Sequence, residues 1–573
     1  MRGPVSPASV FVRVLVLIVA SVSTTASLQA QTFVPTSGTN NWNSGANWST
    51  NPTFPNASGA SATFTATAAM TVPLNVGITV GSITALNDSA GVFNIQAGTA
   101  GTLTFANGGS EATMILNGTS TTTNNFTIST NVVLTDTLRT TVNNVLAITA
   151  LTSSPMTFTG AMSGAGGFIK DGPGRLSFTT ATKTYTGATV VNQGRLRVSV
   201  AGMPTGTSSV LVNAGGQLAL DAASGAFQFG SASTVITING AGETQTSLPG
   251  ALRNENSGTT TLANPVTLGS DATIHTEGTG RILQLNGAVS GAFTLTKTGT
   301  GTIQMTQANA SLSGGTIVRE GVVTVNAGSQ LGTGLLTLAP FTNRSTTVAL
   351  SNANQSIGNL ATDYTSLTTG TQVQTLTLAG TALAITQTAN TSFGNGGIAT
   401  LTGVIGGTGS IALTAASTGT LTLTGPNTYS GGSTVQAGTL SANGSTATFG
   451  TGNVTVNGAA GASSLQIQSG VLNAIADTAT LTLAGGGTAG TADIGFANLG
   501  SGVSETVATL VLNGIMQSAG TYGSTASGAT FQNDEFFNGT GVIVVVPVPE
   551  PASILFATFG IIGVARLLRR KSS

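Results

Sequence analysis

The chain has 573 residues, of which 40% are apolar and only 6% are Asp, Glu, Lys or Arg. Lys and Arg together number 17, as do Asp and Glu, so the formal net charge is zero. Nucleic-acid-binding proteins need a basic footprint, and disordered chains combine high charge with low hydrophobicity. The composition therefore argues against both classes. Cysteine is absent, so disulfide bonds do not contribute to stability.

The N-terminus has the features of a secretory signal peptide. Arg2 and Arg13 precede an apolar run at residues 14–20, and small residues then lead to Ala26 and Ala30. A charged region, an apolar region and a small-residue cleavage site in this order predict export through the Sec machinery. We expect residues 1–30 to be removed after Ala30, with Ala26 as an alternative cleavage site. An uncleaved anchor helix is less favoured, because the apolar run is short.

The segment from residue 31 to residue 546 alternates threonine with aliphatic residues. Alternation of this kind is typical of strands with one buried face, and Gly or Asn-Gly pairs separate the alternating runs. No helical periodicity is present, so the segment is predicted to be all-β. The clearest runs are 102–105, 294–296, 336–338, 375–378, 420–424 and 480–483.

Three stretches of this segment repeat one pattern, in which an apolar residue is followed by glycines two and nine positions later. Each copy reads as strand, turn, strand, glycine turn and strand, and fixed-period self-similarity indicates a repeat architecture. The copies lie near 164–198, 291–325 and 409–440, with Tyr185, Gly187 and Gly194 in the first, Leu312, Gly314 and Gly321 in the second, and Tyr429, Gly431 and Gly438 in the third.

These copies resemble the autotransporter-associated β-strand repeat, an element of parallel β-helices. The resemblance implies one long right-handed parallel β-helix, with an N-terminal solenoid part and cap at 31–150 and a repeat-bearing passenger at 151–546. Roughly 20–25 residues per coil would give about 20–25 coils and a rod of roughly 100–120 Å. Trp42 and Trp48 are expected to cap the first coil, although stacking on sugars is an alternative. Residues 512–546 are expected to cap the last coil.

Side chains for catalysis are scarce, and we predict no enzyme activity and no cofactor. His275 is the only histidine and is interpreted as an outward-facing strand residue. The adjacent acids Asp534 and Glu535 are expected in a solvated turn, and residues 485–493 in a glycine-rich turn rather than a calcium site. A β-helix enzyme acting on carbohydrate, or a carbohydrate-binding protein, is the alternative. Three or more converging acids would favour the enzyme. The other acids stand apart in sequence, for example Asp88, Asp171, Asp221, Asp271, Asp363 and Asp493.

The C-terminal tail, residues 547–573, has three parts. Alternating prolines hold Pro549, Glu550 and Pro551 extended. Residues 552–568 are uncharged before Arg566 and, at about 1.5 Å per residue, just long enough for a single transmembrane helix. A basic cluster follows and predicts a cytoplasmic end. It consists of Arg566, Arg569, Arg570 and Lys571.

This tail resembles the PEP-CTERM sorting signal of Gram-negative bacteria. The resemblance implies recognition by an exosortase, a membrane protease or transpeptidase, and anchoring of the precursor in the inner membrane through lipid contact. The mature passenger is then expected at the cell surface, in the outer membrane or in the extracellular matrix. A structural or adhesive role, related to a biofilm and extracellular polysaccharide, is the expected function.

Overall fold

The structure is a computed structural model that describes residues 30–546. The gaps within this range are 89–90, 119–125, 146–153, 223, 244–248, 256, 310, 352–353, 368–370, 396–401 and 459–460. The predicted signal peptide up to residue 29 and the tail from residue 547 lie outside the described residues, as does the predicted transmembrane helix. In the part of the chain that is described, no helix is long and apolar enough to cross a membrane.

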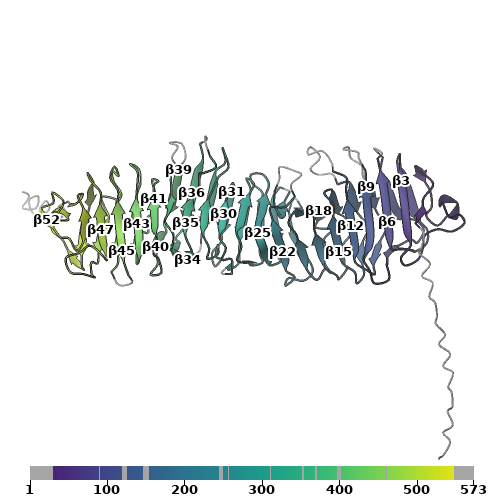
Figure 1. Ribbon diagram of the computed structural model, residues 1–573, viewed down its shortest axis with the longest axis horizontal. Helices are drawn as coiled ribbons and strands as arrows, with labels where there is room; N and C mark the ends of the chain where they lie inside the picture. Colours follow the sequence, from purple (N-terminus) through teal and green to yellow (C-terminus); the bar gives the residue numbers. More distant parts are fainter. Residues whose placement is uncertain are drawn as a thin grey trace, which may run out of the picture.

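The described chain winds into an elongated rod of stacked coils, with the N-terminal coils at one end and the C-terminal coils at the other (Figure 1). Strands of successive coils pair in parallel and form three ladders along the rod. This arrangement confirms the predicted all-β parallel solenoid. One 3₁₀ turn, η1 (Gly45–Asn47), interrupts the strands near the N-terminus.

The first ladder contains β1 (Gln31–Thr32), β3 (Ser61–Ala66), β6 (Ser82–Asn87), β9 (Ala112–Asn117), β12 (Leu138–Val142), β15 (Phe168–Asp171), β17 (Thr189–Val191), β19 (Val210–Val212), β22 (Ile236–Gly240), β25 (Val266–Thr276), β27 (Val289–Ser290), β34 (Asn354–Ile357), β37 (Ala382–Ile385), β40 (Ser410–Leu413), β42 (Ser433–Val435), β44 (Val454–Val456), β46 (Thr480–Leu483) and β49 (Thr509–Leu512).

The second ladder contains β2 (Gly38–Thr39), β4 (Met70–Leu74), β7 (Phe93–Ala97), β10 (Phe126–Ile128), β13 (Met156–Phe158), β16 (Arg175–Phe178), β18 (Gly194–Ser199), β20 (Gly216–Asp221), β23 (Leu252–Asn254), the second half of β25, β28 (Leu295–Thr298), β30 (Thr316–Val318), β32 (Leu336–Leu338), β35 (Leu360–Thr362), β38 (Thr391–Phe393), β41 (Thr420–Leu423), β43 (Gly438–Ala442), β45 (Ser463–Ile467), β47 (Phe496–Leu499) and β53 (Phe537–Gly539).

The third ladder is interrupted, because some coils pass its corner without a regular strand. It contains β5 (Ile78–Val80), β8 (Leu103–Phe105), β11 (Val132–Leu134), β14 (Met162–Ser163), β21 (Gly225–Phe227), β24 (Thr259–Leu262), β26 (Ile282–Leu285), β29 (Thr302–Met305), β31 (Gly321–Val325), β33 (Thr346–Leu350), β36 (Val373–Leu378), β39 (Thr402–Gly407), β48 (Ser504–Val507) and β54 (Val542–Val545).

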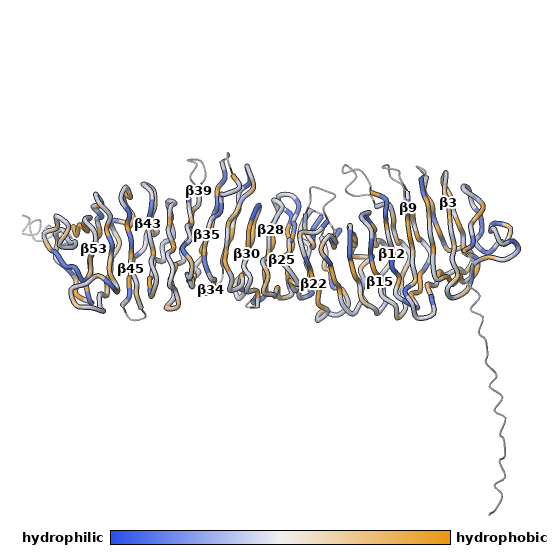
Figure 2. Tube along the Cα trace, viewed as in Figure 1, coloured by the Kyte–Doolittle hydropathy of each residue, from blue (hydrophilic) through white to orange (hydrophobic). Residues whose placement is uncertain are grey.

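The alternating sequence places one side chain in the core and the next on the surface. In β41, Leu421 and Leu423 are buried, whereas Thr420 and Thr422 are half-buried on the outer face. Apolar and polar residues alternate in this way along the whole rod (Figure 2). Stacking the coils joins the inward residues into one continuous core, which is how a solenoid stabilises short strands.

The coils vary in length more than the sequence predicts. Leu421 pairs with Leu440 of the next coil, whereas Ala497 pairs with Phe537, which is much farther along the chain. Corner loops of different length account for the spread, because the paired strands themselves stay short. Within the described residues, the second ladder places about 20 strands side by side. At about 4.8 Å per strand this gives a rod of roughly 95 Å, close to the lower end of the predicted length.

The repeat glycines lie at corners where successive coils approach closely. A Cβ at Gly187, Gly314 or Gly431 would lie 2.3–2.6 Å from backbone atoms of the preceding coil. The later glycine of each copy, such as Gly438 with φ of +76°, also needs the left-handed conformation. Steric constraints therefore explain why glycine occupies both positions of the repeat. The constraint was predicted for the first of the two positions.

The two tryptophans close the N-terminal end of the core. Trp42 and Trp48 are 0% and 1% exposed and pack against Phe33 and Phe64, with ring centroids 5.0–5.5 Å apart. Their indole N–H groups donate to the carbonyl oxygens of Pro55 and Trp42 at 3.0 and 2.6 Å. The predicted cap is confirmed, and complete burial leaves neither ring available for stacking on a sugar.

The C-terminal end is also closed, by the last parallel coil and the short strands that pair with it. Tyr522, Phe537 and Ile543 are buried there. Three short strands complete this cap, namely β50 (Ile515–Met516), β51 (Gly520–Gly523) and β52 (Phe531–Gln532). The cap predicted at residues 512–546 is therefore confirmed.

Candidate functional site

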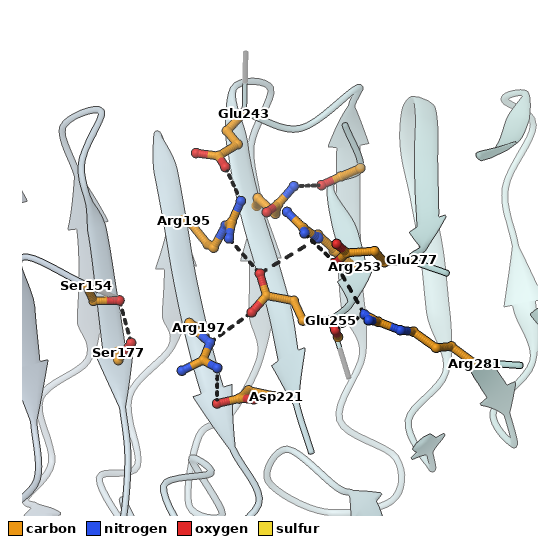
Figure 3. A network of polar contacts seen from close by, with 12 residues as sticks. Ser154, Ser177, Arg195, Arg197, Asp221, Glu243, Arg253, Glu255, Glu277 and Arg281 are labelled. Atoms are coloured by element: carbon orange, nitrogen blue, oxygen red, sulfur yellow. Dashed lines mark hydrogen bonds and ion pairs between the residues drawn. The ribbon is translucent and has the colours of Figure 1, made fainter. Parts of the chain in front are cut away.

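Charged side chains gather on the outer face of the second ladder, between β18 and β25. In β18, Leu196 and Val198 point into the core, so alternation places Arg195 and Arg197 on the opposite face. Arg253 of β23 pairs in register with His275 of β25 and takes the same outward orientation. We call this group the charge cluster. Its members are Arg195, Arg197, Asp221, Glu243, Arg253, Glu255, Glu277 and Arg281 (Figure 3).

Arg195 is the centre of the charge cluster and is 0% exposed. Its guanidinium donates to Oε1 of Glu243 at 2.5 Å and to Oε1 of Glu255 at 2.6 Å. Glu255 also accepts from Nε of Arg197 at 2.8 Å, and Arg197 lies 2.7 Å from Asp221. The two carboxylates of Glu243 and Glu255 are thus both bound by arginine of the strand β18.

Arg253 extends the charge cluster toward the following coil. Its Nη2 donates to Oε2 of Glu277 at 2.6 Å, and Arg281 lies 3.5 Å from the same carboxylate. Arg281 also donates to the backbone carbonyl oxygen of Glu255. Burial and repulsion by Arg195 lower the pKa of Arg253. An arginine nevertheless stays protonated in proteins. The positive charge of the buried Arg253 must therefore be compensated by the acids around it.

An inserted segment contributes a carboxylate to the charge cluster. In the second ladder, the stretch of chain from Leu218 to its partner Leu252 is much longer than the stretch from Leu252 to its next partner, Ile274. The extra residues lie between β22 and β23 and carry Glu243. The carbonyl oxygen of Gly250, in the same segment, accepts from Nε2 of Gln217 at 2.9 Å. Because buried charges must be paired, the cluster fixes this segment to the face of the rod.

His275 lies at the edge of the charge cluster and is 6% exposed. Its Nδ1 is 3.0 Å from Oγ1 of Thr298. Burial, Arg253 and Lys297 lower the pKa of His275 to about 3, so the ring is neutral at physiological pH. The predicted strand position and outward orientation are confirmed, but the residue is buried in the structure, which the sequence did not indicate.

The acids of the charge cluster do not form a catalytic pair. Four acids converge here, which is the condition that would have favoured an enzyme. Each one is ion-paired with arginine, however, and the side chains of Glu243 and Glu255 are only 2% and 7% exposed. Among the described residues, no group of three His, Asp or Glu side chains is placed to bind a metal ion. The arrangement is suited to clamping chain segments together.

Two lysines have a related structural role inside the coil. Lys170 and Lys297 occupy the same position in the first and second repeats and are 0% exposed. Nζ of Lys297 donates to the carbonyl oxygens of Thr298, Gly299 and Glu320, at 2.5–3.1 Å. Lys170 makes the corresponding three bonds at 2.7–3.1 Å. Burial lowers the pKa of each lysine to about 7.

The other predicted positions behave as turns. The Asp534 carboxylate accepts from the backbone N–H and the hydroxyl of Thr525, both at 2.7 Å. Asp493 accepts from the N–H of Thr488 at 2.9 Å, within the glycine-rich turn expected at residues 485–493. Both interpretations as turns are confirmed.

The sorting residues cannot be located in the structure. Pro549, Glu550, Pro551, Arg566, Arg569, Arg570 and Lys571 all lie outside the described residues. Ala30 is described and exposed, and β1 begins at the next residue, Gln31. Cleavage after Ala30 stays a prediction.

Comparison with known proteins supports the repeats. Residues 168–198, 295–325 and 413–442 match the model of a family described as the passenger-associated-transport-repeat. The chain carries three such repeats. Their positions agree with the copies predicted near 164–198, 291–325 and 409–440, and they cover well under half of the chain. No curated protein and no solved structure matched the chain.

The charge cluster was missed in the sequence because its members come from separate coils. Arg195 and Glu243 are 48 residues apart, and Arg195 and Glu255 are 60 apart. One signal was available: seven of the eight members fall between residues 195 and 277 of a chain with only 6% charged residues. Local enrichment of this kind predicts a cluster once the coil length is known.

Proposed function

We propose that this protein is an exported passenger with a structural or adhesive role at the cell surface, and that it is not an enzyme. The observation that supports this most strongly is the set of three passenger-associated-transport repeats within one long solenoid. Repeats of this description belong to a transported passenger. The signal-peptide pattern at residues 1–30 supports the same direction of transport.

The physical character of the rod fits an extracellular structural role. Its stability comes from a continuous apolar core and parallel ladders rather than from disulfide bonds. Outward rows of threonine leave the surface uncharged and hydrogen-bonding, which suits contact with a neutral polymer such as extracellular polysaccharide. A rod capped at both ends is also protected from edge-to-edge aggregation.

Surface exposure can be tested by labelling single cysteines, since the chain has none. Phe341 is 41% exposed, so a Phe341→Cys variant should react with a membrane-impermeant maleimide on intact cells. Leu421→Cys, at a fully buried position, is the matched control and should remain unlabelled. Labelling of the Phe341→Cys variant only after the cells are permeabilised would contradict surface exposure.

The tail is proposed to direct sorting by an exosortase. In this scheme Pro549, Glu550 and Pro551 are recognised, residues 552–568 hold the precursor in the inner membrane, and the basic end fixes its orientation. The support is the order of the three parts in the sequence. Extended proline-containing backbone is accessible to a protease or transpeptidase.

A Glu550→Ala variant separates sorting from simple anchoring. The sorting scheme predicts that this precursor accumulates uncleaved in the inner membrane, whereas wild type is processed. Thr540→Ala, at a position before the tail, serves as the processing control. Equal processing of Glu550→Ala and wild type would remove Glu550 from the recognition element.

A further inference from the structure

The C-terminal end of the rod is formed by strands that lie beyond the last coil. β50 pairs antiparallel with β49, and β49 pairs on its other side with β46. β51 pairs antiparallel with β54, and β52 pairs with β51. Figure 1 shows β52 at this extremity of the rod. The residues of β50 and β52 are exposed.

This end exposes several large apolar side chains. Ile515 and Met516 of β50 are 67% and 72% exposed, Phe531 of β52 is 46% exposed, and Val546 is 40% exposed. We call these four residues the terminal patch. Asn513 and Gly514, with φ of 47° and 77°, form the tight turn that presents Ile515 and Met516.

Phe531 of the terminal patch lies near the point where the chain leaves the rod. The ring of Phe531 stacks on Tyr522, with centroids 4.8 Å apart, and covers Gly520 so closely that a Cβ there would lie 2.7 Å from it. Gly520 is the partner of Val545 in the β51–β54 pair. A single strand, β51, thus lies between Phe531 on β52 and the strand β54, after which the chain leaves the rod at Val546.

The surroundings of the terminal patch cost little to desolvate. Residues 506–533 contain no Asp, Glu, Lys or Arg. The first acid that follows, Asp534, is held by Thr525. Burying apolar surface is favourable, while burying unpaired charge is costly, so this end can approach an apolar phase.

We propose that the terminal patch rests on the lipid surface, with Ile515, Met516 and Phe531 at the boundary between headgroups and acyl chains. This inference rests on the proposed transmembrane role of residues 552–568. Only residues 547–551 separate Val546 from Ala552, and six steps of extended chain span roughly 20 Å. The membrane therefore lies within reach of this end of the rod, and lipid is the apolar phase nearest to the patch.

The test uses the full-length chain in phosphatidylcholine vesicles that contain nitroxide-labelled lipid. An environment-sensitive fluorophore is attached to a Met516→Cys variant, and to a Phe341→Cys variant as the mid-rod control. Both positions are exposed, so neither substitution should alter the fold, which melting curves check. We expect strong quenching and a blue shift at residue 516, and neither effect at residue 341.

The outcomes separate this inference from the proposed function. If the chain floats with the vesicles but both labels are quenched equally, the tail is anchored and the lipid contact is wrong. A blue shift at residue 516 without quenching by the nitroxide lipid would indicate contact with protein, such as a second copy, and would also overturn it. A chain that does not float overturns the transmembrane proposal and this inference together.

Discussion

At the scale of single residues, Lys170 and Lys297 show how a solenoid uses charge inside its core. Each ammonium group has three N–H donors, and each finds three backbone carbonyl oxygens at a corner where two coils meet. The third repeat has Ala415 at this position, four residues before Gly419 as Lys297 is before Gly301. The lysine is therefore an optional stabiliser of the corner.

Replacing Lys297 by methionine should destabilise the rod by about 1–3 kcal/mol, because three buried carbonyl oxygens lose their donor. The outward-facing Thr296 provides the control, and Thr296→Ala should change stability by no more than about 0.5 kcal/mol. Thermal unfolding followed by circular dichroism measures both. If Lys297→Met melts like wild type, the three hydrogen bonds do not contribute to stability.

The buried carboxylate of Glu505 should make the stability of the protein depend on pH. Its buried carboxylate accepts from the N–H groups of Ala474 and Ile475 at 3.0 and 2.7 Å, and burial raises its pKa from about 4.5 to about 7. Between these values the folded chain binds more protons than the unfolded chain. The free energy of unfolding should therefore fall as the pH rises from about 4.5 through 7.

The measurement for Glu505 is the melting temperature as a function of pH, compared with a Glu505→Gln variant that does not titrate. Wild type should lose stability relative to the variant between about pH 5 and about pH 8. Parallel curves for the two proteins would show that the carboxylate keeps an ordinary pKa in the fold.

At the scale of structural elements, the repeat glycines limit how closely coils can stack. Gly431→Val would place a side chain 2.6 Å from backbone atoms of Gly409, and we expect a loss of about 1–3 kcal/mol from overpacking. Gly528→Ala is the matched control, because a Cβ there meets nothing within 4 Å. An unchanged melting curve for Gly431→Val would contradict the assigned corner.

We expect the loss of a buried ion pair of the charge cluster to destabilise the protein more than the loss of an exposed ion pair. Glu243→Gln leaves the buried Arg195 undercompensated and should cost about 3 kcal/mol or more. Glu111→Gln breaks an ion pair with Arg139 in which the side chains are 44% and 34% exposed, and should cost less than about 1 kcal/mol. Denaturant unfolding compares the two variants, and equal costs would show that the cluster does not clamp the inserted segment.

The strands were predictable because their signal is local, while the charge cluster was not. Thr420–Leu423 alternates in sequence as it does in the structure, and the Gly431 corner follows from spacing within one repeat. Pairing of Arg195 with Glu243 depends on the length of the intervening coils, which differs widely along the rod. The apparent isolation of Asp221 in sequence was misleading for the same reason.

At the scale of the whole molecule, the architecture follows from the joined core and its two caps. Trp42 and Trp48 were correctly predicted as a cap, since terminal coils must cover an open apolar end. The rod lies at the lower end of the predicted coil number, because corner loops take up residues without adding coils. The exposed terminal patch was not predicted, since apolar residues in a cap were expected to be buried.

The most direct test of the central claim is the intact mass of the chain recovered from the cell surface or the medium. Export with sorting predicts a mature chain that begins at Gln31 and ends near Pro549, Glu550 and Pro551, without the basic end. A surface chain that begins at Met1 would contradict the predicted signal peptide. A surface chain that retains Lys571 would contradict the proposed sorting tail.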